Sequence, residues 1–164
     1  MLQGSLFWQR GNGSLAGYRN DILGSLRVGD NTVNTATDVG AATVTYSTAG
    51  GILTVGSGTS DNLDIGVRST NVAGITQGKL DLTGTAMLNA NVARVRLGVE
   101  LGGNGSGDVF GNLVLGTNAT ILASTEVLIS DSNAVGIVAQ SVLQTGSGNT
   151  IIQTPLITVG GRKA

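Results

Sequence analysis

Hydrophobic and polar residues alternate along much of this chain in short runs. In Leu53-Thr54-Val55 and Leu80-Asp81-Leu82 the outer residues are apolar and the middle one is polar. Glycine, asparagine, aspartate or serine bounds most of these runs. Alternation with a period of two, closed by turn-forming residues, predicts β-strands. The apolar spacing of an amphipathic helix is nearly absent, so we expect an all-β protein.

Five of these runs share one six-residue form. They begin 27, 27, 33 and 30 residues apart, and such a period is typical of stacked repeat proteins. When the runs are aligned, the third position is always leucine, and the position after it is mostly polar and varied. An apolar column beside a polar one is typical of the inward and outward side chains of a strand. The leucines that we predict to form this core ladder are Leu26, Leu53, Leu80, Leu113 and Leu143.

Each repeat contains further strand-like runs. The fourth repeat predicts strands at Leu113–Leu115, Thr120–Leu122, Glu126–Ile129 and Val135–Val138. Several short strands per repeat, joined by glycine- and asparagine-rich corners, predict a parallel β-solenoid (β-helix). We expect about five coils with a period of 27–33 residues over residues 24–160. An antiparallel β-sandwich is the alternative, but it does not require leucine to recur at one position about every 30 residues.

Residues 1–23 precede the first clear repeat and contain three consecutive large apolar residues, Leu6, Phe7 and Trp8. A solenoid must cover its terminal coil, because an open strand edge pairs with other chains. We therefore expect residues 1–23 to form an N-terminal cap, or to dock on a neighbouring copy through Leu6, Phe7 and Trp8. Residues 161–164 are expected to be a tail.

The composition excludes several classes of function. The 164 residues include no cysteine and no histidine, which excludes disulfides, Cys/His zinc sites, haem–histidine ligation and Ser-His-Asp triads. A net charge of −1 with nine basic residues argues against a nucleic-acid partner. No apolar segment is long enough to span a membrane. We expect no cofactor.

The strands LTVG, LDIG and LVLG, separated by segments such as GTAMLNANV and GTNATILAS, resemble bacterial surface proteins with autotransporter-associated β-strand repeats. More loosely, they resemble the solenoid shafts of large secreted adhesins. The resemblance covers about residues 24–160. It implies an extracellular or cell-surface location and a role as stalk, adhesin or matrix component, without enzyme activity in the repeats. The first residues do not resemble a signal peptide, so we expect the chain to be a fragment or part of an assembly.

The segment Gly102–Gly111 contains GGNGSGDVF and lies in the longest repeat. It resembles the calcium-binding nonapeptide of secreted RTX proteins, in which an aspartate and turn carbonyls supply oxygen ligands. Here one extra residue precedes Asp108, and the motif occurs once, whereas calcium sites in that family need consecutive turns. Asp108 is therefore a weak metal candidate, and we expect an ordinary glycine-rich loop without metal.

Alternation places Arg94 and Arg96 outward on one strand face, with Glu100 four residues after Arg96. Two adjacent guanidinium groups can bind a sugar acid or another anion. The alternative is a solvated face with a local ion pair.

Asp61, Asp64 and Asp81 invite comparison with β-helix enzymes that cleave uronate polymers. A hydrolase needs two carboxylates about 5–10 Å apart, and a lyase needs a basic residue beside neutralised carboxylates. No such grouping recurs in the sequence. Pairs of threonines suggest the flat arrays of ice-binding solenoids, but they fall at different offsets in the repeats. These pairs are Thr35/Thr37, Thr43/Thr45 and Thr83/Thr85.

The sequence therefore favours a non-catalytic structural or interaction module: a solenoid shaft, an adhesin segment or a self-assembling fibre subunit. Its expected partners are other copies, bound end to end, or other surface and matrix components, with carbohydrate as a further ligand. A carbohydrate-active β-helix enzyme is the main alternative, ahead of an ice-binding solenoid. Such an enzyme needs a groove lined with charged and aromatic residues, and the chain is only 12% charged and 3% aromatic.

Overall fold

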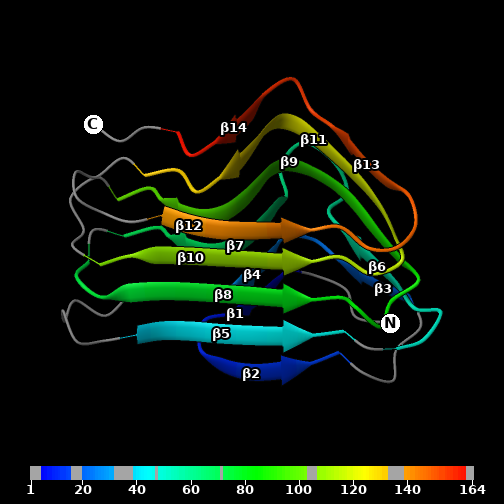
Figure 1. Cartoon of the computed structure of the whole chain (residues 1–164), viewed down its shortest axis with the longest axis horizontal. Coiled ribbons are helices and arrows are strands. Elements are labelled where there is room, and N and C mark those ends of the chain that lie inside the picture. The colour runs from blue at the N-terminus through cyan, green and yellow to red at the C-terminus, as the bar shows by residue number, and fades with distance from the viewer. Residues whose placement is uncertain are drawn as a thin grey trace.

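The computed structural model describes residues 5–15, 20–31, 39–46, 48–70, 72–102, 107–132 and 139–161. This part of the chain contains fourteen β-strands and no helix. Every strand pairing in it is parallel. Figure 1 shows successive coils stacked on one another. The prediction of an all-β parallel solenoid is confirmed.

Each complete coil has three faces, and strands of the same face pair between coils. The first face contains β3 (Asn20–Leu23), β6 (Ile52–Val55), the first parts of β9 (Met87–Glu100) and β11 (Asn118–Ile129), and β13 (Thr150–Gln153). The second face contains β1 (Leu6–Trp8), β4 (Leu26–Val28), β7 (Asn62–Arg68), the second parts of β9 and β11, and β14 (Ile157–Val159). The third face contains β2 (Gly11–Ser14), β5 (Val39–Thr45), β8 (Ile75–Asp81), β10 (Val109–Val114) and β12 (Ala139–Gln144).

The solenoid has about four full turns rather than five. The coils β3–β4–β5, β6–β7–β8, β9–β10 and β11–β12 each supply all three faces. Partial coils β1–β2 and β13–β14 lie at the two ends of the described stack. The third face forms the five-stranded sheet in the foreground of Figure 1, in the order β2, β5, β8, β10 and β12.

The repeat length is set by the register between coils. One core column on the second face runs from Leu26 through Leu63, Val95 and Val127 to Ile157. These residues are 37, 32, 32 and 30 positions apart, so the period is longer than predicted in the first coils. Each coil contributes apolar side chains to one continuous core.

The predicted ladder of five leucines is wrong as a single column. Leu80, Leu113 and Leu143 are register partners on the third face. Leu26 instead belongs to the second face, and Leu53 belongs to the first face, where it pairs with Leu88 of β9. The first four leucines of the ladder are fully buried and Leu143 is partly buried. Strands of all three faces carry similar leucine-containing runs, so the shared motif marks a strand and not one particular face.

A residue with positive φ occupies an equivalent position on the second face in the five coils that contain β4, β7, β9, β11 and β14. In the first four of these coils, this residue directly follows the last side chain that the strand contributes to the main core. In β7 and β9 the strand continues beyond it, and Val67 and Val99 are buried in a separate small cluster. The φ angles are 76° at Gly29, 64° at Gly66, 56° at Gly98, 57° at Ser130 and 65° at Gly160. Only glycine adopts this conformation at low cost, which explains why four of these five positions are glycine.

The segment predicted as a cap is built into the stack. Within residues 1–23, strands β1, β2 and β3 pair with β4, β5 and β6. Leu6 and Trp8 pack against the core, while Phe7 is 59% exposed. Strands β10 and β11 contain most of the first three runs predicted for the fourth repeat. Residues 1–4 and 16–19 of the predicted cap, the predicted strand Val135–Val138 and residues 162–164 lie outside the described residues.

We expect Leu80→Ala to lower the free energy of unfolding by about 2–5 kcal/mol, the range for truncating a buried leucine. Leu80 is fully buried between Val44 and Leu113 in the third-face core column. The matched control is Asp81→Ala, which removes the outward neighbour and should cost about 1 kcal/mol or less. Denaturant melts of both variants test this, and a larger effect at Asp81 would contradict the assigned core.

Candidate functional site

The C-terminal end of the solenoid presents core-facing residues to solvent. Ile157 and Val159 of β14 continue the core columns of Val127 and Ile129. Val127 is buried, yet Ile157 is 54% exposed and Val159 is 69% exposed, because the described residues include no further coil above them. Ile151 and Leu156 of the same coil are also exposed. An apolar surface of this kind is typical of an interaction site.

The N-terminal end carries the other ends of the same columns. Leu6 is the register partner of Leu26, and Trp8 is the partner of Val28. The Trp8 ring lies against Gly13, where an added Cβ would come within 2.7 Å of it. Leu6 and Trp8 are therefore matched in position to Ile157 and Val159, at opposite ends of the stack.

In the described part of the chain, both ends have unpaired backbone edges and few charges, although Asp21 lies on the edge strand β3. Among the described strands, β13 and β14 pair only with β11, and β12 pairs only with β10. Residues 139–161 contain no charged side chain, and residues 5–15 contain only Arg10. Natural proteins usually protect such edges with lysine, proline or a covering segment. Here Pro155 lies in the corner between β13 and β14 rather than on an edge strand.

The outward face of the second-face strands carries a ladder of charges. Asp64 accepts hydrogen bonds from Arg96 at 2.7 Å and from Arg27 at 3.0 Å. Arg27 also binds Asp30 at 2.9 Å and lies 5.9 Å from the ring centroid of Phe7. Asp64 does face outward as predicted, but it is only 2% exposed. The carboxylate hydrogen-bonds to arginines of the two adjacent coils, so Asp64 links three successive coils.

Arg94 and Arg96 lie on one face as predicted, but the structure does not leave them as an anion site. Arg94 binds Glu126 of the next coil at 2.9 Å, and Arg96 binds Asp64 of the previous coil. Glu100 does not pair with either of them. Its carboxylate accepts a hydrogen bond from Arg68 Nε, and both side chains are fully buried.

This buried pair belongs to a polar column that the sequence did not reveal. Arg68 is the register partner of Glu100, and Glu100 forms a bridge with Ser132. Arg68 also donates to the Gly74 carbonyl at 2.7 Å, and Glu100 accepts from the Gly102 amide at 2.6 Å. The column pins the loops that follow the second face to the stack. Its only sequence signal is register, since Arg68 and Glu100 are 32 residues apart.

The three aspartates considered for catalysis do not form a common site. Asp61 accepts hydrogen bonds from the amide and hydroxyl of Ser57 and from the Ser25 hydroxyl. Asp64 is held by arginines on the second face, and Asp81 lies on the third face at the end of β8. Each carboxylate has its own structural partners, which is the arrangement of turn and ladder residues rather than of an acid–base pair.

Burial and hydrogen bonds act in opposite directions on the pKa of the Asp81 carboxyl group. Burial acts to raise the pKa of this carboxyl, but Lys79 at 3.0 Å and the amide and hydroxyl of Thr83 hydrogen-bond to it. These contacts outweigh burial and hold the pKa below its ordinary value. A lowered pKa favours folding above the unfolded-state pKa, and this contribution disappears as the pH falls through the lowered value.

The remaining candidates are also dispersed. Asp108 precedes β10, and its carbonyl accepts a hydrogen bond from Thr76. Residues 103–106 of the glycine-rich segment lie outside the described residues, and the described part has no group of three or more metal-ligating side chains. Of the threonine pairs, Thr43/Thr45 lie on β5, Thr83/Thr85 follow β8 with Thr85 buried, and Thr35/Thr37 are not described.

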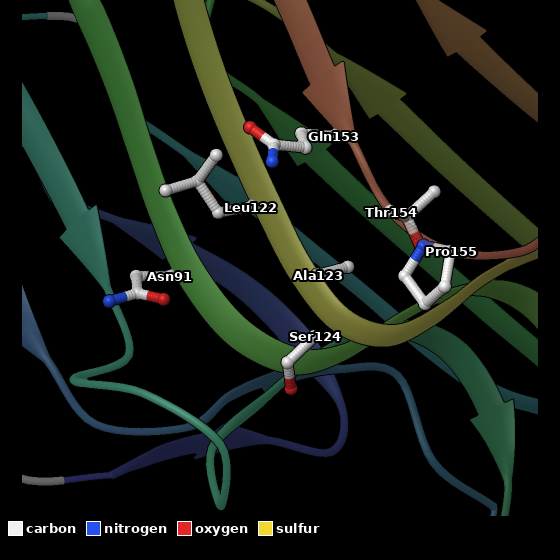
Figure 2. A pocket seen from close by; sticks show the side chains of 7 residues that line it. All are labelled: Asn91, Leu122, Ala123, Ser124, Gln153, Thr154 and Pro155. Atoms are coloured by element: carbon white, nitrogen blue, oxygen red, sulfur yellow. The ribbon is translucent and has the colours of Figure 1, made fainter.

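A hollow of about 430 Å³ lies at the corner between the first and second faces. Figure 2 shows Asn91, Leu122 and Gln153, which are register partners in three successive coils, beside Ser124 and Pro155. The register shift between Ala123 and Glu126 of β11 forms a bulge here. The lining has no charged or aromatic side chain, and its upper rim belongs to the exposed C-terminal coil.

No family model, curated protein or solved structure matches this chain. In the part of the chain that is described, no helix is long and apolar enough to cross a membrane.

Proposed function

We propose that this chain is a non-catalytic structural module of a bacterial surface protein, a β-solenoid that assembles end to end outside the cell. The observation that carries the proposal is the exposure of core-facing Ile157 and Val159 on a charge-free strand edge. The two end surfaces of a parallel stack are complementary, because each coil pairs through its backbone and its core columns with the coil that follows it. Leu6 and Trp8 of a second copy would continue the columns that end at Ile157 and Val159.

The energetics favour this contact. Full burial of an isoleucine or valine side chain contributes about 1.5–3 kcal/mol each. New parallel backbone hydrogen bonds along the edge strands would add to this, against the translational and rotational entropy lost on association. The nearly neutral ends offer little electrostatic repulsion. In this contact the C-terminal end of one copy meets the N-terminal end of the next. Because these two surfaces differ, the contact is heterologous and does not close, so the product is a linear fibre.

Two further observations support the proposed surface location and the proposed lack of catalysis. The resemblance to autotransporter-associated β-strand repeats supports the bacterial cell surface. The hydrogen bonds and ion pairs that hold Asp61, Asp64 and Asp81 in separate places support a module without hydrolase or lyase activity. No observation favours ice binding, because the described threonine pairs do not form one flat array.

We expect Val159→Lys to abolish assembly, because a charge placed on the core-facing edge must be desolvated when the next copy docks. The matched control is Val39→Lys, which changes a 43% exposed valine of the inner strand β5. Sedimentation velocity over a range of concentrations, with negative-stain microscopy, measures the effect. The wild-type chain and Val39→Lys should form rods of increasing length, while Val159→Lys stays monomeric with the same circular dichroism spectrum. A wild-type chain that is monomeric at every concentration would overturn the proposal.

A further inference from the structure

The outer surface of the third face has a hollow of about 300 Å³ over strands β5, β8 and β10. Two outward rows of register partners border it. One row is Ala41, Gln77 and Phe110, and the other row is Thr43, Lys79 and Asn112. Figure 1 shows these three strands side by side in the sheet. Small residues open the space between the rows, since Ala42 and Gly78 also line the hollow.

The hollow is chemically neutral and rich in free hydrogen-bonding groups. Its one charged side chain, Lys79, is already paired with Asp81 at 3.0 Å. The side chains of Gln77, Asn112 and Thr43 form no hydrogen bond with any described residue. Each amide can donate and accept at once, and the hydroxyl can do the same.

Phe110 supplies an apolar surface beside these polar groups. It is only partly buried and lies on the outward side of β10, between buried Val109 and Gly111. An aromatic ring combined with neighbouring amides and a hydroxyl fits a ligand that has both apolar C–H faces and many hydroxyl groups. That combination is the chemistry of a neutral sugar ring.

We propose that this hollow binds one sugar ring of a neutral polysaccharide. Its volume is at the lower end of the range of about 300–1,000 Å³ for small-molecule sites, which suits a single ring of a longer chain. The open sheet on either side lets the polymer continue over β2 and β12. A polyanion is disfavoured because the Lys79 charge is neutralised by Asp81. A matrix glycan is thus a second partner, independent of the contact between copies.

The site does not depend on assembly. Its lining residues lie on β5, β8 and β10, which are inner strands of the third face, flanked by β2 and β12. A substitution at the C-terminal edge should therefore leave it intact. Sugar binding and assembly can accordingly be tested separately on the same chain.

Isothermal titration of the full chain with cellohexaose, xylohexaose and chitohexaose tests the proposal, with hexagalacturonate as the anionic comparison. We expect at least one neutral oligosaccharide to bind, and hexagalacturonate to bind at least tenfold more weakly. Phe110→Leu, which keeps apolar bulk but removes the ring, and Asn112→Ala should each weaken binding at least tenfold. The matched control is Asn89→Ala, a similarly half-buried outward asparagine on the first face.

Melting temperatures of these variants should match that of the wild type, so that lost binding reports on the hollow and not on unfolding. Repeating the titration with Val159→Lys separates this proposal from end-to-end assembly. Three results would overturn it: no neutral oligosaccharide binds, Phe110→Leu and Asn112→Ala bind as well as Asn89→Ala, or hexagalacturonate binds as tightly as the neutral probes.

Discussion

Replacing Gly111 by alanine should lower the free energy of unfolding by more than about 4 kcal/mol or prevent folding. A loss of this size is exceptional for a single substitution, and here it follows from a clash with the backbone. A Cβ added at Gly111 would lie closer than 3 Å to the Gly98 amide nitrogen and the Ile65 carbonyl oxygen. Gly78 makes the same contact one coil earlier, against Gly66 and Val28. In both cases the atoms that the added Cβ would strike are backbone atoms near the positive-φ residues of the second face, so the movement of a side chain cannot relieve the clash.

Gly50→Ala separates this steric effect from backbone strain. Gly50 has a φ of 71°, but nothing lies within 4 Å of an added Cβ. Gly111 has no such positive φ. The Gly50 variant should cost only about 1–2 kcal/mol, the penalty for a left-handed L-residue. Chemical denaturation followed by circular dichroism compares the two. If Gly111→Ala is no less stable than Gly50→Ala, the third face is not in backbone contact with the corner.

The fold could be predicted from sequence because its main signals are local. Alternation within each strand and glycine at the corners are visible without any structure. The assignment of runs to faces is not local, as the leucines show. The 33- and 30-residue intervals after Leu80 are true coil repeats, whereas the 27-residue intervals from Leu26 to Leu53 and Leu80 connect different faces.

The functional surfaces depend on register, which periodicity alone does not fix. Ile157 is a core residue by register and a surface residue by position at the end of the stack. The position of Phe110 between inward-facing Val109 and Gly111 indicates an outward aromatic ring, but only the register with β5 and β8 shows which side chains lie beside it. The sequence does not indicate that Arg68 pairs with Glu100, because only the stacking of β7 on β9 brings the two residues together.

Glu100→Ala should lower the free energy of unfolding by about 3–5 kcal/mol, because it leaves the Arg68 guanidinium buried without its counter-charge. Both side chains are 0% exposed, and Arg68 Nη2 has no hydrogen-bond partner among the described residues. Water therefore cannot replace the lost carboxylate without opening the polar column. The loops at Gly74 and Gly102, which the pair holds through backbone hydrogen bonds, should become more labile in hydrogen exchange.

Glu126→Ala is the matched control, since it breaks another glutamate–arginine pair between adjacent coils. The Arg94 side chain of that pair is 41% exposed, so the variant should cost no more than about 1 kcal/mol, and less at high salt. The double variant Arg68→Met/Glu100→Leu should recover most of the stability lost in Glu100→Ala, because apolar replacement of a buried pair removes the desolvation penalty. Urea melts of all three at low and high salt measure these differences. Equal, salt-sensitive losses for Glu100→Ala and Glu126→Ala would show that the Arg68–Glu100 pair is hydrated and does not anchor the loops.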